Sequence, residues 1–254
     1  IILFILLVLS VIKIYQMPNL ILVRHGQSEW NLEKRFTGWV DVDLTAQGKL
    51  EACKSGENIR ELNINIDYFF SSFQLRAINT LKIIQDTLRD KREPIKAWQL
   101  NERHYGALTG LNKDEMKNKL GEDKIYEFRR SWSMKPEPLS RNNPYHPLNI
   151  KTYKKIPKEM IPDTESLKDT YERVTEYFNL NIQSKLLGNK NILISAHGNS
   201  IRALCKFLFK LDNKKISLLE IPTGNPLFIN LDSKLNITEC RYLDRDRAKD
   251  LLIF

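Results

Sequence analysis

Two apolar segments of strand character, far apart in the chain, each end in a His-Gly pair. The first covers residues 19–23 and leads into His25, and the second covers residues 191–195 and leads into His197. In a parallel sheet the carboxyl ends of the strands meet at one edge, where ligands bind, so the two histidines would face the same crevice. The glycine after each histidine lets backbone N–H groups approach a ligand closely. The two segments therefore indicate an α/β sheet with an anion site at one edge.

Helical segments alternate with strands along most of the chain. Thr45 is a good N-cap for a helix that runs to about Leu62, with Leu50, Cys53 and Ile59 on one recurring face. The remaining pattern predicts a strand at 67–72, helices at 75–88, 113–120, 123–132, 164–187 and 201–211, and a last strand at 227–231. This order predicts an α/β fold with a mostly parallel central sheet covered by helices on both faces.

A stretch rich in proline and asparagine, residues 136–162, interrupts this alternation. An irregular segment of such length inside a domain is usually functional or mobile. Since no internal repeat and no linker divides the chain, we expect residues 17–254 to form a single domain with this segment as an inserted excursion.

Residues 1–16 form an apolar N-terminal extension ahead of Met17. Its apolar part, residues 1–12 with Ser10 as the exception, is shorter than the roughly 18 residues of a membrane span. It also lacks the positively charged start and the cleavage site of a signal peptide. Three interpretations stay open: an over-long start of the reading frame, which we favour, a truncated membrane anchor, or an extra apolar helix.

A net charge of +9 suits anionic partners, namely nucleic acid, acidic membranes or phosphorylated metabolites. The lysines are scattered over the whole chain without a zinc-finger spacing or an RNA-binding signature, so we expect no nucleic-acid partner. We expect no membrane partner either, unless residues 1–16 are a real anchor. Cys53, Cys205 and Cys240 are far apart and odd in number, which favours a reduced, cytoplasmic compartment.

Arginine recurs beside the predicted strand ends and helix starts, at Arg24, at Arg76 and in the pair of Arg129 and Arg130. Arginine matches phosphate oxygens in two-point geometry, and a neutral imidazole can attack phosphorus without first losing a proton. The pattern predicts phosphoryl transfer through a histidine, with Glu102 as the group that exchanges protons with the reacting oxygens. The sequence has no glycine-rich phosphate loop and no metal-ligand spacing, so we predict neither a nucleotide hydrolase nor a bound metal.

Five blocks of the sequence resemble the cofactor-dependent phosphoglycerate mutases of the histidine phosphatase superfamily. The blocks are residues 22–31 with 36–39, 100–108 with 110–113, 165–170, 196–204 and 221–224. Arg-His-Gly marks only the broad superfamily, whereas the Asn-Glu-Arg-His-Tyr-Gly block and the lysine after it are far more specific to the mutases. The resemblance implies the fold of that family and its reaction, the interconversion of 3-phosphoglycerate and 2-phosphoglycerate.

The resemblance also implies a role for each site residue. His25 would be phosphorylated after priming by 2,3-bisphosphoglycerate, Glu102 would donate and accept the proton, and His197 would stabilise the group in transfer. The residues that would hold this phosphoryl group are Arg24, Arg76, Asn31 and Gly198. Those that would bind the rest of the substrate are Ser28, Thr37, Gly38, Arg103, Tyr105, Lys113, Arg129, Arg130 and Asn199. The implied partners are small phosphorylated sugar acids and further copies of the chain, in a homodimer or homotetramer.

Three other functions compete with isomerisation. A related bisphosphoglycerate synthase carries glycine in place of Ser28 and Cys-Ser in place of Thr37 and Gly38, so the residues present favour the mutase. A broad phosphatase is disfavoured because the residues around Glu102 suit a small anionic sugar acid, and a non-catalytic scaffold is disfavoured because no catalytic residue is missing. The segment after residue 244 is short and ends in apolar residues, and we expect it to exclude water less well and to raise hydrolysis of the phosphohistidine.

Overall fold

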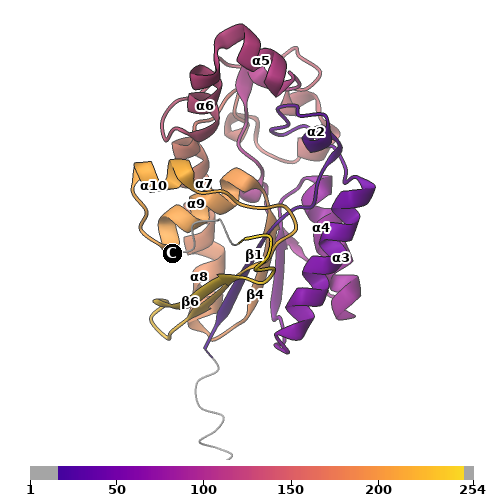
Figure 1. Ribbon diagram of the computed structural model, residues 1–254, viewed down its shortest axis with the longest axis vertical. Helices are drawn as coiled ribbons and strands as arrows, with labels where there is room; N and C mark the ends of the chain where they lie inside the picture. Colours follow the sequence, from indigo (N-terminus) through magenta and orange to yellow (C-terminus); the bar gives the residue numbers. More distant parts are fainter. Residues whose placement is uncertain (1–16, 249–254) are drawn as a thin grey trace, which may run out of the picture.

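The computed structural model describes residues 17–248, so the expectations for residues 1–16 and for the tail after residue 248 lie outside the described residues. Within that range the centre is a six-stranded sheet in the order β3-β2-β4-β1-β5-β6 (Figure 1). The strands are β1 Asn19–Arg24, β2 Tyr68–Ser71, β3 Ile95–Lys96, β4 Ile192–Ala196, β5 Leu227–Leu231 and β6 Ile237–Tyr242. Strands β1 to β4 pair in parallel, and β5 and β6 are antiparallel to their neighbours.

The predicted mostly parallel α/β sheet is confirmed, but the sequence pattern missed both edge strands. β3 has only two residues, and both are exposed. In β6 only the last residue is buried, so the strand has little need for a regular alternation of apolar and polar residues. Edge strands with little buried surface carry a weak hydrophobic signal.

Strands β1 and β4 bring the two histidines to the same place. The strands pair with Arg24 opposite Ala196, and the His25 amide donates to the Ala196 carbonyl at 3.0 Å. Both strands are apolar and almost wholly buried, which fits the centre of a parallel sheet. Their carboxyl ends therefore place His25 and His197 side by side.

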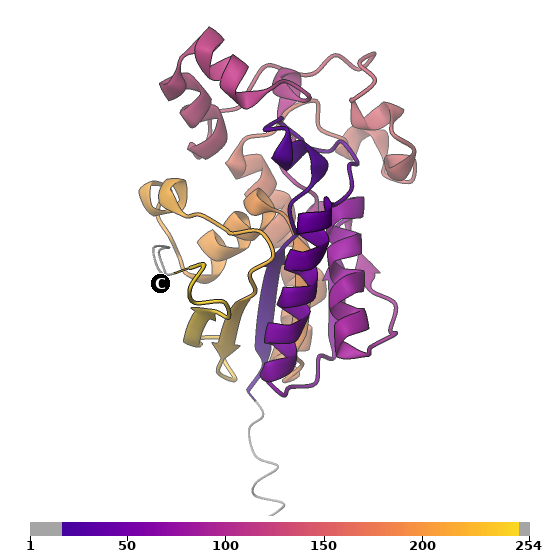
Figure 2. The same cartoon turned by 45° about the vertical axis from the view of Figure 1, so that its right-hand side comes forward.

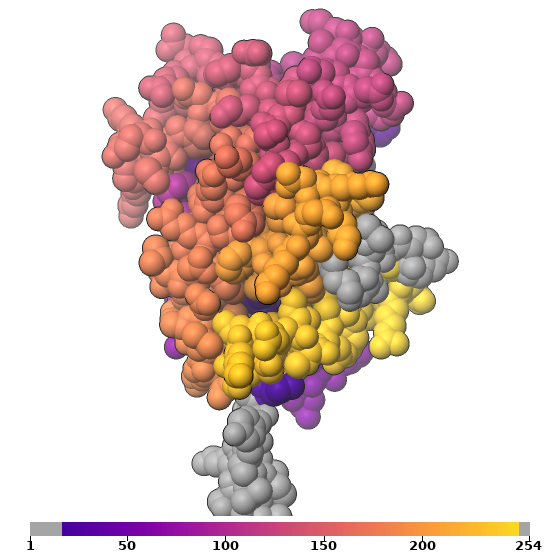
Figure 3. Space-filling view, turned by 90° about the vertical axis from the view of Figure 1, so that its left-hand side faces the viewer, coloured from indigo at the N-terminus to yellow at the C-terminus, as the bar shows by residue number. Residues whose placement is uncertain are grey.

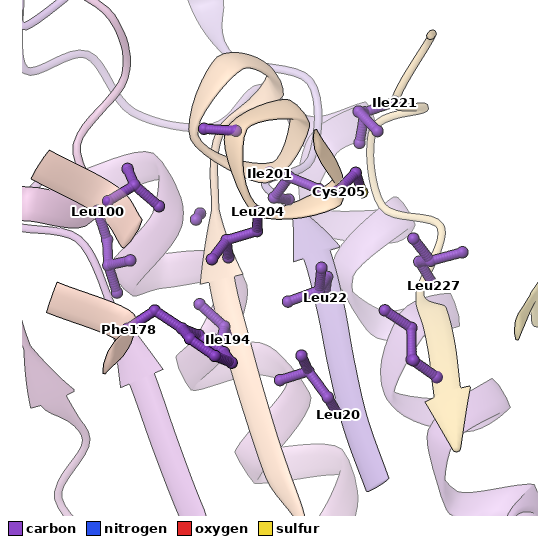
Figure 4. Close-up of a cluster of buried hydrophobic side chains, with 14 of the residues drawn as sticks. Leu20, Leu22, Leu100, Phe178, Ile194, Ile201, Leu204, Cys205, Ile221 and Leu227 are labelled. Atoms are coloured by element: carbon purple, nitrogen blue, oxygen red, sulfur yellow. The ribbon is translucent and has the colours of Figure 1, made fainter. Parts of the chain in front are cut away.

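Helices cover both faces of the sheet, as predicted (Figures 1 and 2). On one face lie α3 (Ala46–Glu61) and α4 (Leu75–Leu88), and on the other α7 (Leu167–Tyr177) and α9 (Gly198–Leu208). A π-helical turn at Phe178–Ile182 joins α7 to α8 (Gln183–Leu187). The larger core lies under α7 and α9; Figure 4 shows its strand residues Leu20, Leu22 and Ile194 below Ile201 and Leu204 of α9.

Helix α3 begins where predicted but buries a different face. Thr45 caps it, with Oγ accepting from the Gly48 amide at 3.0 Å. Leu50 is 64% exposed and Cys53 is exposed as well, so the prediction for these two residues is wrong, whereas Ile59 is buried. The buried side carries small residues because α3 packs closely against α4: a Cβ on Gly56 would lie 2.7 Å from a side-chain carbon of α4.

The start of α9 lies nearer to the predicted site than the sequence pattern suggested. The pattern placed the helix at 201–211, but α9 begins at Gly198, directly after His197. The Ser200 hydroxyl accepts from the His197 amide at 3.0 Å and so ties the strand end to the first helical turn. The positive end of the α9 dipole consequently adjoins the two histidines.

A cap lies over the carboxyl edge of the sheet (Figure 2). It contains α2 (Glu29–Leu32), α5 (Lys113–Leu120), α6 (Glu122–Arg130) and short 3-10 turns at Trp98–Leu100, Gly106–Leu108, Pro147–Asn149, Lys151–Tyr153 and Lys158–Met160. The 136–162 excursion is irregular, as predicted, but it is packed: Tyr153, Ile156 and Ile161 are buried in a cluster with Trp39. After α9 comes α10 (Asn213–Leu218), which contacts α6. None of the helices within residues 17–248 has the length and apolar character of a membrane span.

Candidate active site

A cavity lies at the carboxyl edge of the sheet, beneath the cap. Most of the predicted site residues line it, namely Arg24, His25, Asn31, Thr37, Gly38, Arg76, Glu102, Tyr105, Lys113, Arg129, Arg130, Gly198 and Asn199. Four residues that the sequence did not single out line it too: Arg35, Arg202, Glu220 and Ile221. Ser28, Arg103 and His197 do not line it, although each lies directly behind a residue that does.

His25 is set up as a neutral imidazole with one free ring nitrogen. Its side chain is buried, and burial, followed by the charges of Arg76 and Arg24, holds its pKa well below the usual value. Nδ1 lies 2.7 Å from the Gly26 carbonyl oxygen, and because a carbonyl only accepts, we assign the ring proton to Nδ1. Nε2 then keeps its lone pair, which is the state that a nucleophile needs.

His197 lies against His25, with the ring centroids 5.0 Å apart. Its Nε2 is 2.8 Å from the Oγ atom of Ser72, the residue directly after β2, and this contact orients the ring. Its Nδ1 is buried and, within the described part of the chain, has no hydrogen-bond partner. Burial, followed by the charge of Arg76, lowers the pKa of His197 well below its usual value. His197 thus has a ring nitrogen without a partner among residues 17–248, and this ring lies against His25 although it does not line the cavity.

Two arginines, the buried Arg76 and the half-buried Arg24, lie beside the histidines and are held by carbonyl groups. Arg76 is 1% exposed and donates to the carbonyls of Val40 and Gly38, both at 2.9 Å. Arg24 donates to the Ile221 carbonyl at 2.7 Å, and its Nε is buried with no hydrogen-bond partner among residues 17–248. Burial lowers the pKa of both guanidinium groups. Since carbonyls do not neutralise the two charges, both remain available to an anion.

Glu102 reaches the same space from the cap side. Its Oε1 accepts from the Arg103 amide at 2.8 Å and from Asn199 Nδ2 at 2.9 Å. A Cβ on Gly198 would lie 3.8 Å from Glu102 Oε2 and 3.6 Å from Arg24 Nε. The second carboxylate oxygen, the arginine and the start of α9 therefore converge on one point, where a proton could pass to a ligand.

A buried ion pair between Arg173 and Glu165 holds the loop that carries Glu102. The guanidinium meets both carboxylate oxygens, at 2.6 and 2.9 Å. Arg173 also donates to the carbonyls of Gln99, Asn101 and Glu102, at 2.6, 3.0 and 3.0 Å. This pair had no assigned role in the sequence, although Glu165 begins one of the five resembling blocks.

Asn199 links Glu102 to Tyr105 across the cavity. Its Nδ2 donates to Glu102 Oε1 at 2.9 Å and to the Tyr105 hydroxyl at 3.0 Å. Arg202 Nη1 donates to Asn199 Oδ1 at 3.0 Å and so fixes which end of the amide faces the carboxylate. Burial lowers the pKa of Arg202 to about 9. Arg202 follows Asn199 by three residues on the same helix, a spacing that brings two side chains together. This spacing could have identified Arg202 from the sequence.

The rest of the cavity wall is strongly cationic. Seven cations line it, Arg24, Arg35, Arg76, Lys113, Arg129, Arg130 and Arg202, against the carboxylates of Glu102 and Glu220. Burial lowers the pKa of Lys113. Burial also tends to raise the pKa of Tyr105, but Arg103 and the other nearby cations outweigh it, so the phenol pKa lies below its usual value. This wall suits a small ligand with several negative charges.

Ser28 and Arg103 support the site from behind. Ser28 Oγ accepts from the Asn31 amide at 3.3 Å, and Asn31 Oδ1 accepts from the Ser28 amide at 3.2 Å, so the two residues cap α2. Arg103 lies over the Tyr105 ring, 4.6 Å from its centroid, and donates to the Phe128 carbonyl. The structure thus places both residues next to cavity residues and not on the cavity surface.

Comparison with known proteins gives three findings. The family model of the histidine phosphatase superfamily (branch 1) matches residues 20–145 and 141–234. The 2,3-bisphosphoglycerate-dependent phosphoglycerate mutase of Pelagibacter ubique (strain HTCC1062) is 82% identical over 238 residues, which are 94% of this chain and 100% of that protein. The enzyme of that name from Maricaulis maris (strain MCS10) is 47% identical over 237 residues, which are 92% of this chain and 98% of that protein.

Among solved structures, a mycobacterial glucosyl-3-phosphoglycerate phosphatase in complex with VO3 superposes with a TM-score of 0.65 at 20% identity. The alignment covers 89% of this chain and 96% of that one. At this level of identity the likeness concerns the fold alone.

Proposed function

The chain belongs to the histidine phosphatase superfamily, and from its likeness to the mutases and from its cavity we infer that it interconverts 3-phosphoglycerate and 2-phosphoglycerate. It is a 2,3-bisphosphoglycerate-dependent isomerase of glycolysis and gluconeogenesis. The observation that carries this function is the 82% identity to a mutase over that protein's whole length. The convergence of His25 and Glu102 on one cationic cavity, with His197 directly behind His25, supports the same reaction.

We propose that His25 is the nucleophile. Its neutral ring presents Nε2 to the phosphorus, the phosphorus–oxygen bond of the substrate breaks, and a phosphorus–nitrogen bond forms. Arg24 and Arg76 bear the charge that spreads over the phosphoryl oxygens, which is where most of the catalysis of such transfers lies. His197 Nδ1 and the α9 N-terminus at Gly198 complete this subsite, with Asn31 beside it.

Glu102 is the proposed acid and base. The oxygen that leaves phosphorus becomes an alkoxide unless a proton reaches it, and Glu102 Oε2 faces the space beside Arg24. The same carboxylate takes a proton from the hydroxyl that attacks the phosphohistidine in the return step. Asn199, which donates to the other oxygen, keeps Oε2 turned toward the substrate.

The remaining cavity residues bind the parts of the substrate that do not react. In this proposal the carboxylate and the second phosphate lie against Thr37, Gly38, Tyr105, Lys113, Arg129, Arg130 and Asn199. Ser28 and Arg103 act through their neighbours, Asn31 and Tyr105, because neither lines the cavity.

The donor set also fits 2,3-bisphosphoglycerate. Arg24 Nε and His197 Nδ1 are buried without partners in residues 17–248, and the cavity wall carries seven cations. When bound, this cofactor supplies the phosphoryl group that primes the enzyme. Arg24 and Arg76 would hold one phosphate beside His25, and Lys113 with Arg129 and Arg130 would hold the other.

We also propose that residues 17–254 form one domain and that the protein acts in the cytoplasm, where the phosphoglycerates of glycolysis occur. We further propose that it assembles as a homodimer or homotetramer. Light scattering of the purified chain measures the assembly, and a monomeric mass would contradict that part.

The test of function is conversion of 3-phosphoglycerate with a trace of 2,3-bisphosphoglycerate, followed by the appearance of 2-phosphoglycerate. We expect conversion by the unaltered protein and none by H25A. Absence of conversion by the unaltered protein, or full activity of H25A, would contradict the proposed function.

A further inference from the structure

Glu220 lies on a short segment between α10 and β5, at the rim of the cavity. Figure 3 shows this side of the molecule, with the cap (magenta) above the orange region that includes α10. Apart from Glu102 it is the one carboxylate among the described residues that line the cavity. The sequence reading assigned it no role.

The backbone around Glu220 is fixed by three successive carbonyl groups. The Leu219 carbonyl accepts from Arg130 at 3.3 Å, the Glu220 carbonyl from the Tyr242 hydroxyl at 3.3 Å, and the Ile221 carbonyl from Arg24 at 2.7 Å. Tyr242 is 2% exposed, so this anchor belongs to the core. These bonds therefore hold the backbone of Glu220 in a constant place beside two of the cavity arginines, and they leave its side chain free to move.

The Glu220 carboxylate forms an ion pair with Arg130, one of the proposed substrate-binding cations. The two side chains are unequally exposed: Arg130 is 14% exposed and Glu220 is 54% exposed. The arginine is thus part of the wall, whereas the carboxylate can turn into solvent. An ion pair with one partner this exposed contributes little to stability, so an incoming anion can replace it.

We propose that Glu220 is a resident counter-ion that the anionic, non-reacting end of the substrate displaces from Arg130, and that it thereby sets how tightly the cavity binds anions. This inference rests on the proposed function, because it deepens the substrate binding of the same site. Glu220 neutralises one cation of the wall while the cavity is empty and competes for it when a phosphoglycerate arrives. The residue weakens binding of every anion that reaches Arg130, so it limits the affinity for substrate and product alike.

The test is E220Q, which keeps the shape of the side chain and removes its charge. An exposed ion pair contributes up to about 1 kcal/mol, which corresponds to about fivefold in affinity. We expect KM for 3-phosphoglycerate to fall about two- to fivefold, without a rise in kcat. The dissociation constant of inorganic phosphate, measured by calorimetry without turnover, should fall by a similar factor.

The matched control is E239Q on β6. Glu239 is 52% exposed and pairs with Arg241 outside the cavity, so this variant changes net charge equally and should leave KM and phosphate affinity unchanged. An unchanged or higher KM and phosphate dissociation constant in E220Q overturn the proposal. If the unaltered chain fails to convert 3-phosphoglycerate, the proposed function fails, while the calorimetry still reports whether Glu220 competes with an anion.

Discussion

Replacing Arg173 by methionine removes five hydrogen bonds and leaves the Glu165 carboxylate buried without its partner. The Arg173 and Glu165 side chains are 9% and 4% exposed, so water cannot take over the role of the guanidinium. Removal of one partner from a buried ion pair costs about 3–5 kcal/mol. We expect R173M to lower the free energy of unfolding by that amount, measured by urea denaturation.

Activity should fall for a separate reason. Three of the five hydrogen bonds go to the carbonyls of Gln99, Asn101 and Glu102, so their loss lets the Glu102 loop move relative to His25. A misplacement of about 1 Å at a reacting group costs on the order of a hundredfold in rate. We expect kcat for 3-phosphoglycerate to fall by about that factor with KM changed far less, because the cations that bind substrate stay in place.

Two further variants separate positioning from general damage. The double variant R173M/E165M leaves no unpaired buried charge, so it should regain stability but not kcat. R141M is the matched control: Arg141 pairs with Asp163 through two hydrogen bonds as well, at 2.9 and 3.1 Å, but its side chain is 66% exposed. R141M should change neither quantity appreciably. A kcat close to that of the unaltered protein in R173M, or its return in the double variant, would refute the positioning role.

Three more outcomes follow from the site and its surroundings. Burial lowers the pKa of the His104 imidazole to about 3, whereas an unfolded histidine titrates near 6.5. The free energy of unfolding should therefore be at its full value above pH 6.5 and should fall as the pH drops toward 3. In H104N this pH dependence should be weaker by about 1.4 kcal/mol per pH unit. 3-Phosphoglycerate at about a hundred times its dissociation constant should raise the unfolding free energy by about 2.7 kcal/mol, and R76M should abolish most of that gain at the same concentration; an equal gain in R76M would contradict the assigned anion site. R202L should lower kcat/KM for 3-phosphoglycerate about tenfold, because Asn199 loses the charged donor that fixes its amide, and wild-type kinetics would contradict this coupling.

The position of the site could be predicted because its strongest signals are local. An apolar run that ends in His-Gly identifies a buried strand and the residue at its carboxyl end, and the parallel orientation of the two strands then follows from the alternation of strands and helices. His25 and His197 were expected at one edge for this reason, and the register of Arg24 with Ala196 places them there.

Other features depend on contacts between distant segments, which no local pattern contains. Leu50 and Cys53 fit the helical period of α3, but the close approach of α4 selects small residues such as Gly56 for the buried side. The hydroxyl of Ser28 is chemically suited to contact a ligand, but in the structure it accepts a hydrogen bond that caps α2. Glu220 enters the cavity only because Tyr242, Arg130 and Arg24 hold its segment there.

The chemistry and the substrate preference of this site come from different parts of the fold. In the proposed mechanism, the sheet edge and the start of α9 supply His25, His197 and Arg24, which would move the phosphoryl group to and from the imidazole while Glu102 exchanges the proton. They do not decide whether the acceptor is water or a second phosphoglycerate hydroxyl. Transfer to the phosphoglycerate, and not to water, requires that the non-reacting end of the substrate stays bound while His25 is phosphorylated. The cations proposed to bind that end, Lys113 and Arg130 among them, belong to the cap. Substitutions of these cap cations should therefore raise hydrolysis relative to isomerisation, whereas substitutions at the sheet edge should reduce both reactions together.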